Sequence, residues 1–181
     1  CRRMKKHLTL QAALLSLAEE SGQGIFFVKG TGQEDFLSYQ QLYNSALTLL
    51  GTMQEKGVEK GSEVVIQAEN NDSFVIMFWA CILGGAIPVP VEIAKSDELK
   101  LKVNNIVRAL NKPFVLIEKD SELGIKDYLD KSFEKENERN KVSSLIFEEL
   151  EKVNVKGEIS KVEENDVAFI QFSSGSTGNP K

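Results

Sequence analysis

The chain is organised around the stretch that reads Asp166-Val-Ala-Phe-Ile-Gln-Phe-Ser-Ser-Gly-Ser-Thr-Gly-Asn-Pro-Lys181. Its first part, Val167 to Phe172, is uncharged and mostly apolar, with the length and the β-branched or aromatic content of a buried strand. The second part is rich in Ser, Thr and Gly and closes on Pro180 and Lys181. This pattern predicts a strand that leads directly into a loop.

The loop contains the groups that bind a polyphosphate. Gly175 and Gly178 allow positive φ and a close approach of the backbone to a ligand. Successive backbone N–H groups can then converge on an anion, and Lys181 adds a point charge. The hydroxyl groups that can donate to phosphate oxygens belong to Ser173, Ser174, Ser176 and Thr177. We therefore predict that residues 173–181 bind phosphate groups.

Other interpretations of the loop fit its spacing less well. The Walker loop requires Gly-x-x-x-x-Gly-Lys-Ser/Thr, whereas Gly178 is followed here by Asn-Pro-Lys. The dinucleotide pattern Gly-x-Gly-x-x-Gly does not occur. A flexible Gly/Ser linker is the remaining alternative. A linker needs neither an adjoining apolar strand nor Pro-Lys at a fixed place, so the phosphate loop is favoured.

Residues 173–181 resemble the phosphate-loop signature of the acyl-adenylate-forming superfamily, Thr/Ser-Ser-Gly-Ser/Thr-Thr-Gly-x-Pro-Lys-Gly. This superfamily includes acyl-CoA synthetases, fatty acyl-AMP ligases, luciferases and the adenylation domains of peptide synthetases. Asn179 takes the variable place, and the signature's final Gly would follow Lys181. Less specific resemblances are Leu37-Ser-Tyr-Gln-Gln-Leu42 and the Gly-Gly run from Trp79 to Pro90.

The resemblance implies that the whole protein activates a carboxylic acid with ATP and Mg²⁺. The resulting acyl group would pass from the adenylate to the thiol of phosphopantetheine on an acyl carrier protein, or to coenzyme A. Residues 173–181 would hold the β- and γ-phosphates. No catalytic residue and no metal ligand are assigned, because the family's catalytic lysine, adenine pocket and magnesium-binding acid follow the phosphate loop. Residues 1–181 are thus expected to be an incomplete N-terminal subdomain of an AMP-binding domain, inactive alone.

Two stretches bear on the acid that is activated. Ala168-Phe-Ile-Gln-Phe172 and Ile87-Pro-Val-Pro-Val91 are most similar to fatty acyl-AMP ligases and to the acyl-ligase loading domains of polyketide or nonribosomal peptide synthases. The resemblance therefore favours a fatty or other acyl substrate, with an amino acid second and ligation to free coenzyme A third. Alternatives from other classes are a non-catalytic nucleotide-binding module and a structural domain with a Ser/Gly tether.

Composition argues against several other functions. The net charge of −5 leaves no basic stripe for nucleic acid. The two cysteines are too few for a disulfide framework, Cys81 lies in an apolar segment typical of a core, and a reducing cytoplasm is the simplest location. His7 is the sole histidine and has no Cys or His cluster around it, so neither a metal site nor a Cys/His nucleophile is supported.

Two segments imitate membrane or export signals. The uncharged run from Phe74 to Val91 is interrupted by two glycines and two prolines, which favours a core helix followed by a short strand. Near the N-terminus, Leu10, Leu14 and Leu17 have the spacing of an amphipathic helix rather than of a signal peptide. We therefore expect no association with a membrane.

The remaining pattern predicts an α/β fold with a parallel sheet, because strands and helices alternate between residues 63 and 118. Expected helices cover residues 8–21, 38–57, 73–83, 96–110 and a short stretch at 145–150. Expected strands cover 24–29 and 34–38, as a hairpin, and then 63–68, 87–91 and 114–118. Ser38 and Gln41 form a capping box. The mixed-charge run 131–141 indicates a solvated helix end or a mobile loop.

Overall fold

A computed structural model describes residues 8–30, 32–133 and 142–172. Its elements follow one another in the order α1 (Leu10–Ala18), β1 (Gly24–Val28), β2 (Glu34–Ser38), α2 (Tyr39–Glu55), β3 (Glu63–Gln67), α3 (Asn71–Gly84), β4 (Ile87–Pro90), α4 (Asp97–Ala109), β5 (Phe114–Ile117), α5 (Lys119–Phe133), β6 (Ser143–Ile146) and α6 (Phe147–Leu150). Every helix and strand predicted between residues 8 and 118 is present, with ends that differ by a few residues.

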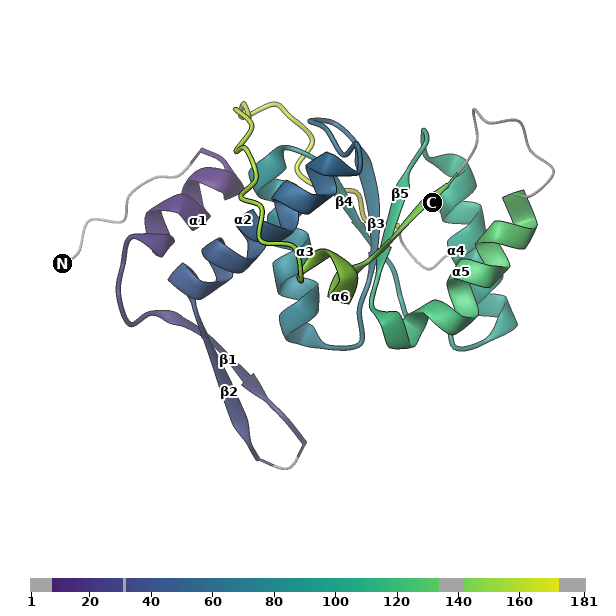
Figure 1. Ribbon diagram of the computed structural model, residues 1–181, viewed down its shortest axis with the longest axis horizontal. Helices are drawn as coiled ribbons and strands as arrows, with labels where there is room; N and C mark the ends of the chain where they lie inside the picture. The colour runs from purple at the N-terminus through teal and green to yellow at the C-terminus, as the bar shows by residue number, and fades with distance from the viewer. Residues whose placement is uncertain (1–7, 31, 134–141, 173–181) are drawn as a thin grey trace.

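Four parallel strands form the central sheet, in the order β4-β3-β5-β6. Val65 of β3 pairs with Val89 of β4 on one side and with Val115 of β5 on the other. A helix connects each strand to the next, as parallel pairing requires. The β1–β2 hairpin is a separate antiparallel pair that extends away from this body (Figure 1). The predicted α/β fold with a parallel sheet is confirmed.

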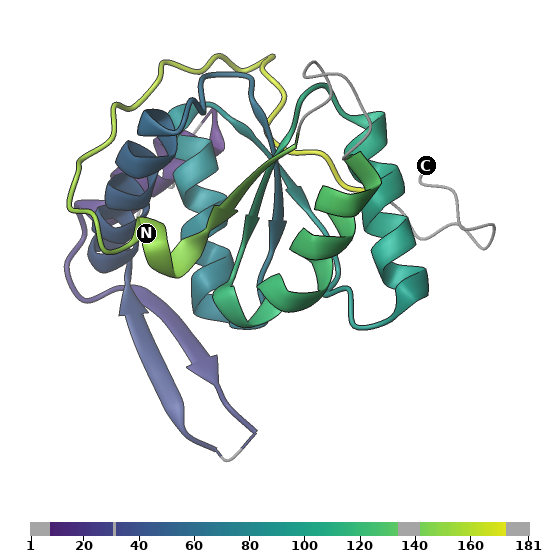
Figure 2. The same cartoon turned by 45° about the vertical axis from the view of Figure 1, so that its right-hand side comes forward.

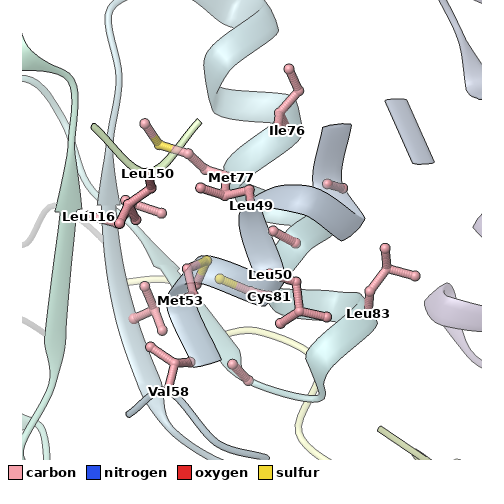
Figure 3. Packing of buried hydrophobic residues seen from close by; sticks show 14 of the residues in the cluster. Leu49, Leu50, Met53, Val58, Ile76, Met77, Cys81, Leu83, Leu116 and Leu150 are labelled. Atoms are coloured by element: carbon pink, nitrogen blue, oxygen red, sulfur yellow. The ribbon is translucent and has the colours of Figure 1, made fainter. Parts of the chain in front are cut away.

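Helices cover both faces of the sheet. Side chains alternate along a strand, so Val64 and Ile66 of β3 join a core with α1, α2 and α3, whereas Val65 joins a second core with α4 and α5. Figure 3 shows the first core, where α2 and α3 meet through Leu49, Met53, Met77 and Cys81. Burial raises the pKa of the Cys81 thiol to about 12, which agrees with its predicted place in the core.

The sequence pattern of α2 predicts both its start and its buried face. The Ser38 hydroxyl accepts from the Gln41 N–H at 3.1 Å, and the Gln41 side chain accepts from the Ser38 N–H at 3.0 Å. This reciprocal pair is the capping box expected from the sequence. Apolar residues at helical spacing in the sequence predict one buried face, and its four members are fully buried: Leu42, Ala46, Leu49 and Met53.

The region after β5 differs from the sequence-based expectation. Helix α5 and strand β6 were not predicted, and the short helix expected from residue 145 begins at Phe147. Leu145 and Ile146 belong instead to β6, where they pair with β5. Such a four-residue strand has too little local pattern to identify itself, and its pairing partner decides its conformation. Most of the charged run, residues 134–141, lies outside the described residues.

Strand β4 has an unusual outer edge. The backbone N–H groups of Ile87 and Val91 donate toward β3, to Ser62 at 2.8 Å and Ile66 at 3.1 Å. Because backbone direction alternates along a strand, Pro88 and Pro90 face the opposite side. Proline has no N–H, so this outer edge offers carbonyl acceptors and no donors at these positions.

After α6 the chain turns back over the first core as a long irregular segment, residues 151–172, which we call the return segment. Figure 2 shows it in yellow-green, passing outside α2. The Gly157 N–H donates to the carbonyl of Leu47 at 2.8 Å. A Cβ on Gly51 would lie 2.2 Å from the Val155 oxygen, and one on Gly157 would lie 2.7 Å from the Gly51 nitrogen. Both glycines are therefore needed for the two backbones to approach this closely.

Side-chain amides fix the return segment to the helices below it. Gln54 of α2 both donates to the Glu158 carbonyl and accepts from its N–H, each at 2.8 Å. The nearly buried Gln11 of α1 donates from its Nε2 to Leu83 at 2.9 Å and to Ser160 at 2.8 Å, with a longer contact to Ile82 at 3.3 Å. Gln11 thereby joins α1, the last turn of α3 and the return segment.

A buried carboxylate connects the carboxyl ends of β3 and β5. Glu118, which follows β5, is 3% exposed and accepts from the Glu69 N–H at 2.6 Å, the Asn70 N–H at 3.3 Å and the Asn70 Nδ2 at 2.9 Å. Burial raises the pKa of this carboxyl, but hydrogen bonds from Ser73, Asn70 and the Glu69 backbone outweigh it, and the net pKa lies below its usual value.

We predict that Gln11→Leu lowers the free energy of unfolding by about 1–3 kcal/mol, because the carbonyls of Leu83 and Ser160 lose their donor. Urea denaturation measures this change. The control is Gln40→Leu at an exposed position of α2, expected to change stability by less than about 0.5 kcal/mol. Equal effects of the two substitutions would contradict the role of Gln11.

We predict that Glu118→Gln destabilises the fold by about 1–3 kcal/mol at neutral pH. The reason is that the Gln amide would place its own N–H donors against the N–H groups of Glu69 and Asn70. The folded pKa of Glu118 lies below the unfolded value of about 4.3. Its contribution is therefore complete above that pH and is lost as pH falls through the lower folded value. Urea denaturation at several pH values should show the two proteins converging in acid.

The control for that experiment is Glu98→Gln, at an exposed position in the first turn of α4. Its difference from the unsubstituted protein should stay small at every pH. A constant difference between Glu118→Gln and the unsubstituted protein down to strongly acidic pH would show that the Glu118 charge contributes nothing.

Candidate functional site

The segment that leads into residues 173–181 is not a β-strand. Val167 to Phe172 is irregular in the structure, and the side chains of Val167 and Phe169 are 57% and 45% exposed. Among the described residues, one backbone hydrogen bond joins this segment to the sheet, from the Ile170 N–H to the Pro88 carbonyl at 3.0 Å. The prediction of a buried strand at 167–172 is therefore wrong.

The prolines of β4 give the physical reason. A parallel ladder alternates N–H donors and carbonyl acceptors along both strands. The outer edge of β4 can accept, as Pro88 does from Ile170, but Pro88 and Pro90 cannot donate back. An apolar segment beside this edge forms isolated contacts rather than a ladder.

The segment nevertheless runs alongside β4. It begins at Asp166, which contacts Lys60 ahead of β3, and continues to Ile170 beside Pro88. It ends at Phe172, which lines a groove with the carboxyl end of β4. The direction is thus parallel to the strands. Ligands of open α/β sheets bind outside the carboxyl ends of the strands, and the chain reaches residue 172 on that side.

The groove at this end has a volume of about 460 Å³ and lies between β4, α4 and the end of the return segment. Its apolar wall includes Val91, Leu99, Ile106 and Phe172. Lys102 and Glu92, 3.7 Å apart, supply opposite charges to the same groove. The surface beside Phe172 therefore combines apolar area with a polar rim.

The predicted binding residues themselves lie outside the described residues: Ser173, Ser174, Gly175, Ser176, Thr177, Gly178 and Lys181. Their donor set, made of hydroxyls, glycine N–H groups and one ammonium, fits the polyphosphate of ATP. No group of three or more His, Cys, Asp or Glu side chains with metal-binding geometry occurs in the part of the chain that the structure describes. No residue is therefore assigned to Mg²⁺.

Two residues fix the backbone of this region by hydrogen bonds, and no sequence pattern identifies their role. Glu118 fills the position between the carboxyl ends of β3 and β5, the point where helices change from one face to the other and where such sheets commonly hold a ligand. Gln11 fixes the return segment from a helix far away in the chain. Both act through tertiary contacts, and a single polar residue on an element does not reveal them.

Within residues 8–30, 32–133 and 142–172, no helix is both long and apolar enough to cross a lipid bilayer. The uncharged run Phe74–Val91 forms most of α3 and then β4, as predicted. Trp79 of α3 packs against Phe78 with ring centroids 5.9 Å apart. Cys81 is buried in the first core, and Trp79 is partly buried against it.

Comparison with known proteins finds a synthase and a probable CoA ligase among the relatives of the chain. The chain is 28% identical over 152 residues to tyrocidine synthase 3 of Brevibacillus parabrevis. This match covers 82% of this chain and 2% of that protein. The chain is 23% identical over 163 residues to a probable CoA ligase, CCL6, of Humulus lupulus, which covers 81% of this chain and 24% of the relative. The chain therefore spans a quarter or less of the length of these curated relatives.

Solved structures agree with this relationship. An A-PCP structure of McyG complexed with phenylalanyl-adenylate matches with a TM-score of 0.83 and 29% identity, over 98% of this chain and 32% of that one. The fatty acid AMP ligase from Legionella pneumophila matches with a TM-score of 0.76 and 24% identity, over 97% and 30% of the two chains. The second likeness supports the fold alone.

Residues 17–181 match the profile of the family described as AMP-binding enzyme. The match covers all of the elements of the central sheet and extends through the Ser/Thr/Gly-rich loop. The chain belongs to the AMP-binding, adenylate-forming enzyme family.

Proposed function

We propose that the protein containing this chain forms an acyl-adenylate from ATP and a carboxylic acid, and that residues 173–181 bind the β- and γ-phosphates. The observation that carries the proposal is the phosphate-loop signature from Ser173 to Lys181 within a chain that matches the AMP-binding family. The position of residue 172 at the carboxyl end of β4 supports it, because that is where open α/β sheets bind ligands.

The loop would contribute orientation and charge stabilisation. When the carboxylate attacks the α-phosphate, negative charge builds up on the departing pyrophosphate. Backbone N–H groups near Gly175 and Gly178, the loop hydroxyls and the Lys181 ammonium are donors that can stabilise this charge. Holding the phosphates in one place also aligns the α-phosphate with the acid. Mg²⁺ bound to ATP would neutralise further charge.

For the substrate, a fatty or other acyl acid is the first candidate, supported by the similarity of Ala168–Phe172 and Ile87–Val91 to fatty acyl-AMP ligases. An amino acid is the second, supported by the 29% identity and TM-score of 0.83 to the McyG structure with its phenylalanyl-adenylate. The acceptor is proposed to be the phosphopantetheine thiol of a carrier protein, with coenzyme A as the alternative, and the location the cytoplasm.

The first test is acid-dependent exchange of labelled pyrophosphate into ATP by the full-length protein, over a panel of fatty acids and amino acids. We expect exchange with at least one acid. Absence of exchange with every acid, in a folded protein supplied with Mg²⁺, would overturn the proposed activity. The acid with the highest kcat/KM decides between the two substrate classes.

We predict that Lys181→Ala lowers kcat/KM for ATP about 10- to 100-fold, because one charge-assisted contact contributes about 1.5–3 kcal/mol. The same exchange assay measures this change. Lys156→Ala removes an exposed lysine from the return segment and is expected to leave kcat/KM unchanged. If the two variants behave alike in an active enzyme, Lys181 does not bind phosphate.

We also predict that residues 1–181 expressed alone give no pyrophosphate exchange, because they span only about a third of the solved adenylate-forming structures that they match. Circular dichroism must first show that this shorter protein is folded. Exchange by the folded 181-residue protein at a rate near that of the full-length enzyme would contradict this prediction.

A further inference from the structure

A closed turn precedes the segment that leads to the phosphate loop. The Asp166 N–H donates to the Glu163 carbonyl at 3.1 Å, and the Asp166 carboxylate accepts from the Glu163 N–H at 2.9 Å. Both ends of residues 163–166 are thus tied together. The turn is a local unit whose placement on the protein depends on contacts beyond it.

Lys60 supplies such a contact. Its Nζ donates to the Lys161 carbonyl at 2.7 Å and lies 2.8 Å from the Asp166 carboxylate. Lys60 belongs to the turn just before β3, where the Gly61 N–H donates to the Gly85 carbonyl at 2.8 Å. Lys60 is therefore attached to the backbone that starts both β3 and β4. Lys60 thus holds the turn 163–166 beside the amino ends of β3 and β4.

The residues after this turn are held by side-chain packing, in which Ile170 and Phe172 contact the second core, and by one backbone hydrogen bond. Ile170 makes one backbone hydrogen bond to Pro88, and the Phe169 ring packs on Phe78 with centroids 6.0 Å apart. The donor-free edge of β4 prevents a regular ladder that would set the register. Three residues lie between Asp166 and Ile170, so a shift of the docked turn is transmitted directly to the segment beside β4.

We propose that Asp166, held by Lys60, is a positioning residue for the phosphate loop. The pair sets where residues 167–172 lie along β4, and hence where residue 173 begins. The effect on the bound nucleotide rests on the proposed function, whereas the docking of the segment does not. Asp166 acts through the backbone that follows it and contacts neither ATP nor the acid.

If the pair served only the global stability of the protein, its loss would lower the melting temperature. The two side chains are 46% and 39% exposed, and exposed ion pairs contribute little to global stability. Loss of the pair should therefore leave the melting temperature almost unchanged. A change confined to the segment beside β4 and to the KM for ATP would then come from positioning.

The experiment uses the full-length enzyme with Asp166→Ala. Glu164→Ala is the matched control, since it removes the same charge from the same turn at an exposed position. Lys60→Met is a second variant, which breaks the docking contact and leaves the hydrogen bonds between Glu163 and Asp166 in place. Three experiments are made: hydrogen exchange of a peptide spanning residues 167–172, pyrophosphate exchange to obtain kcat and the KM values for ATP and for the acid, and thermal unfolding to obtain the melting temperature.

We expect Asp166→Ala to speed exchange of the Ile170 amide and to raise the KM for ATP, each by about fivefold, the upper range for one exposed ion pair. The KM for the acid and the melting temperature should change little, and Lys60→Met should reproduce both effects. Glu164→Ala should match the unsubstituted enzyme.

Unchanged hydrogen exchange in Asp166→Ala, or equal changes in Glu164→Ala, would overturn the docking role. Faster exchange with an unchanged KM for ATP would overturn the role in nucleotide binding while leaving the docking intact. If the unsubstituted enzyme shows no activity with any acid, the proposed function fails, and hydrogen exchange still decides whether Asp166 places the segment.

Discussion

The contact between the backbones of α2 and the return segment is the constraint on which the path of the chain depends. At Gly51 and Gly157 neither residue has room for a Cβ, and the Gly157 N–H bonds directly to the Leu47 carbonyl. Without this approach the chain could not cross α2 and pass the end of α3 toward β4. Gln11, Gln54 and Lys60 bind the same segment at other points, and these contacts depend on the close approach at the two glycines.

Local patterns predicted the elements whose own sequence decides their structure. Helix α2 is such a case, because its capping box and the spacing of its buried residues are both visible in the sequence. The alternation of strands and helices was sufficient for the parallel sheet. Strand β6 was missed because four residues with two serines at the start become a strand through pairing with β5. Its conformation depends on a partner that no local window contains.

The segment at 167–172 shows how a correct family assignment can rest on a partly wrong structural expectation. Its composition predicts a buried strand, yet Val167 and Phe169 are substantially exposed and the neighbouring edge lacks donors. The glycine and hydroxyl pattern after Phe172 identified the family, and the match of residues 17–181 confirms that assignment. Composition reports the propensity of a segment, whereas the donors and acceptors of its neighbour decide whether a ladder forms. Residues 173–181, the proposed binding loop, lie outside the described residues, and the proposal rests on their chemistry and on the family.

The two prolines of β4 have a consequence for how copies of the protein meet one another. An exposed sheet edge normally offers alternating donors and acceptors to any extended chain and so invites aggregation. At Pro88 and Pro90 this edge presents acceptors alone, and one of them is already used by Ile170. A strand from another molecule would leave its own carbonyls unpaired against the proline rings. The same residues that keep the return segment irregular therefore also protect this side of the sheet against edge-to-edge association during synthesis and folding.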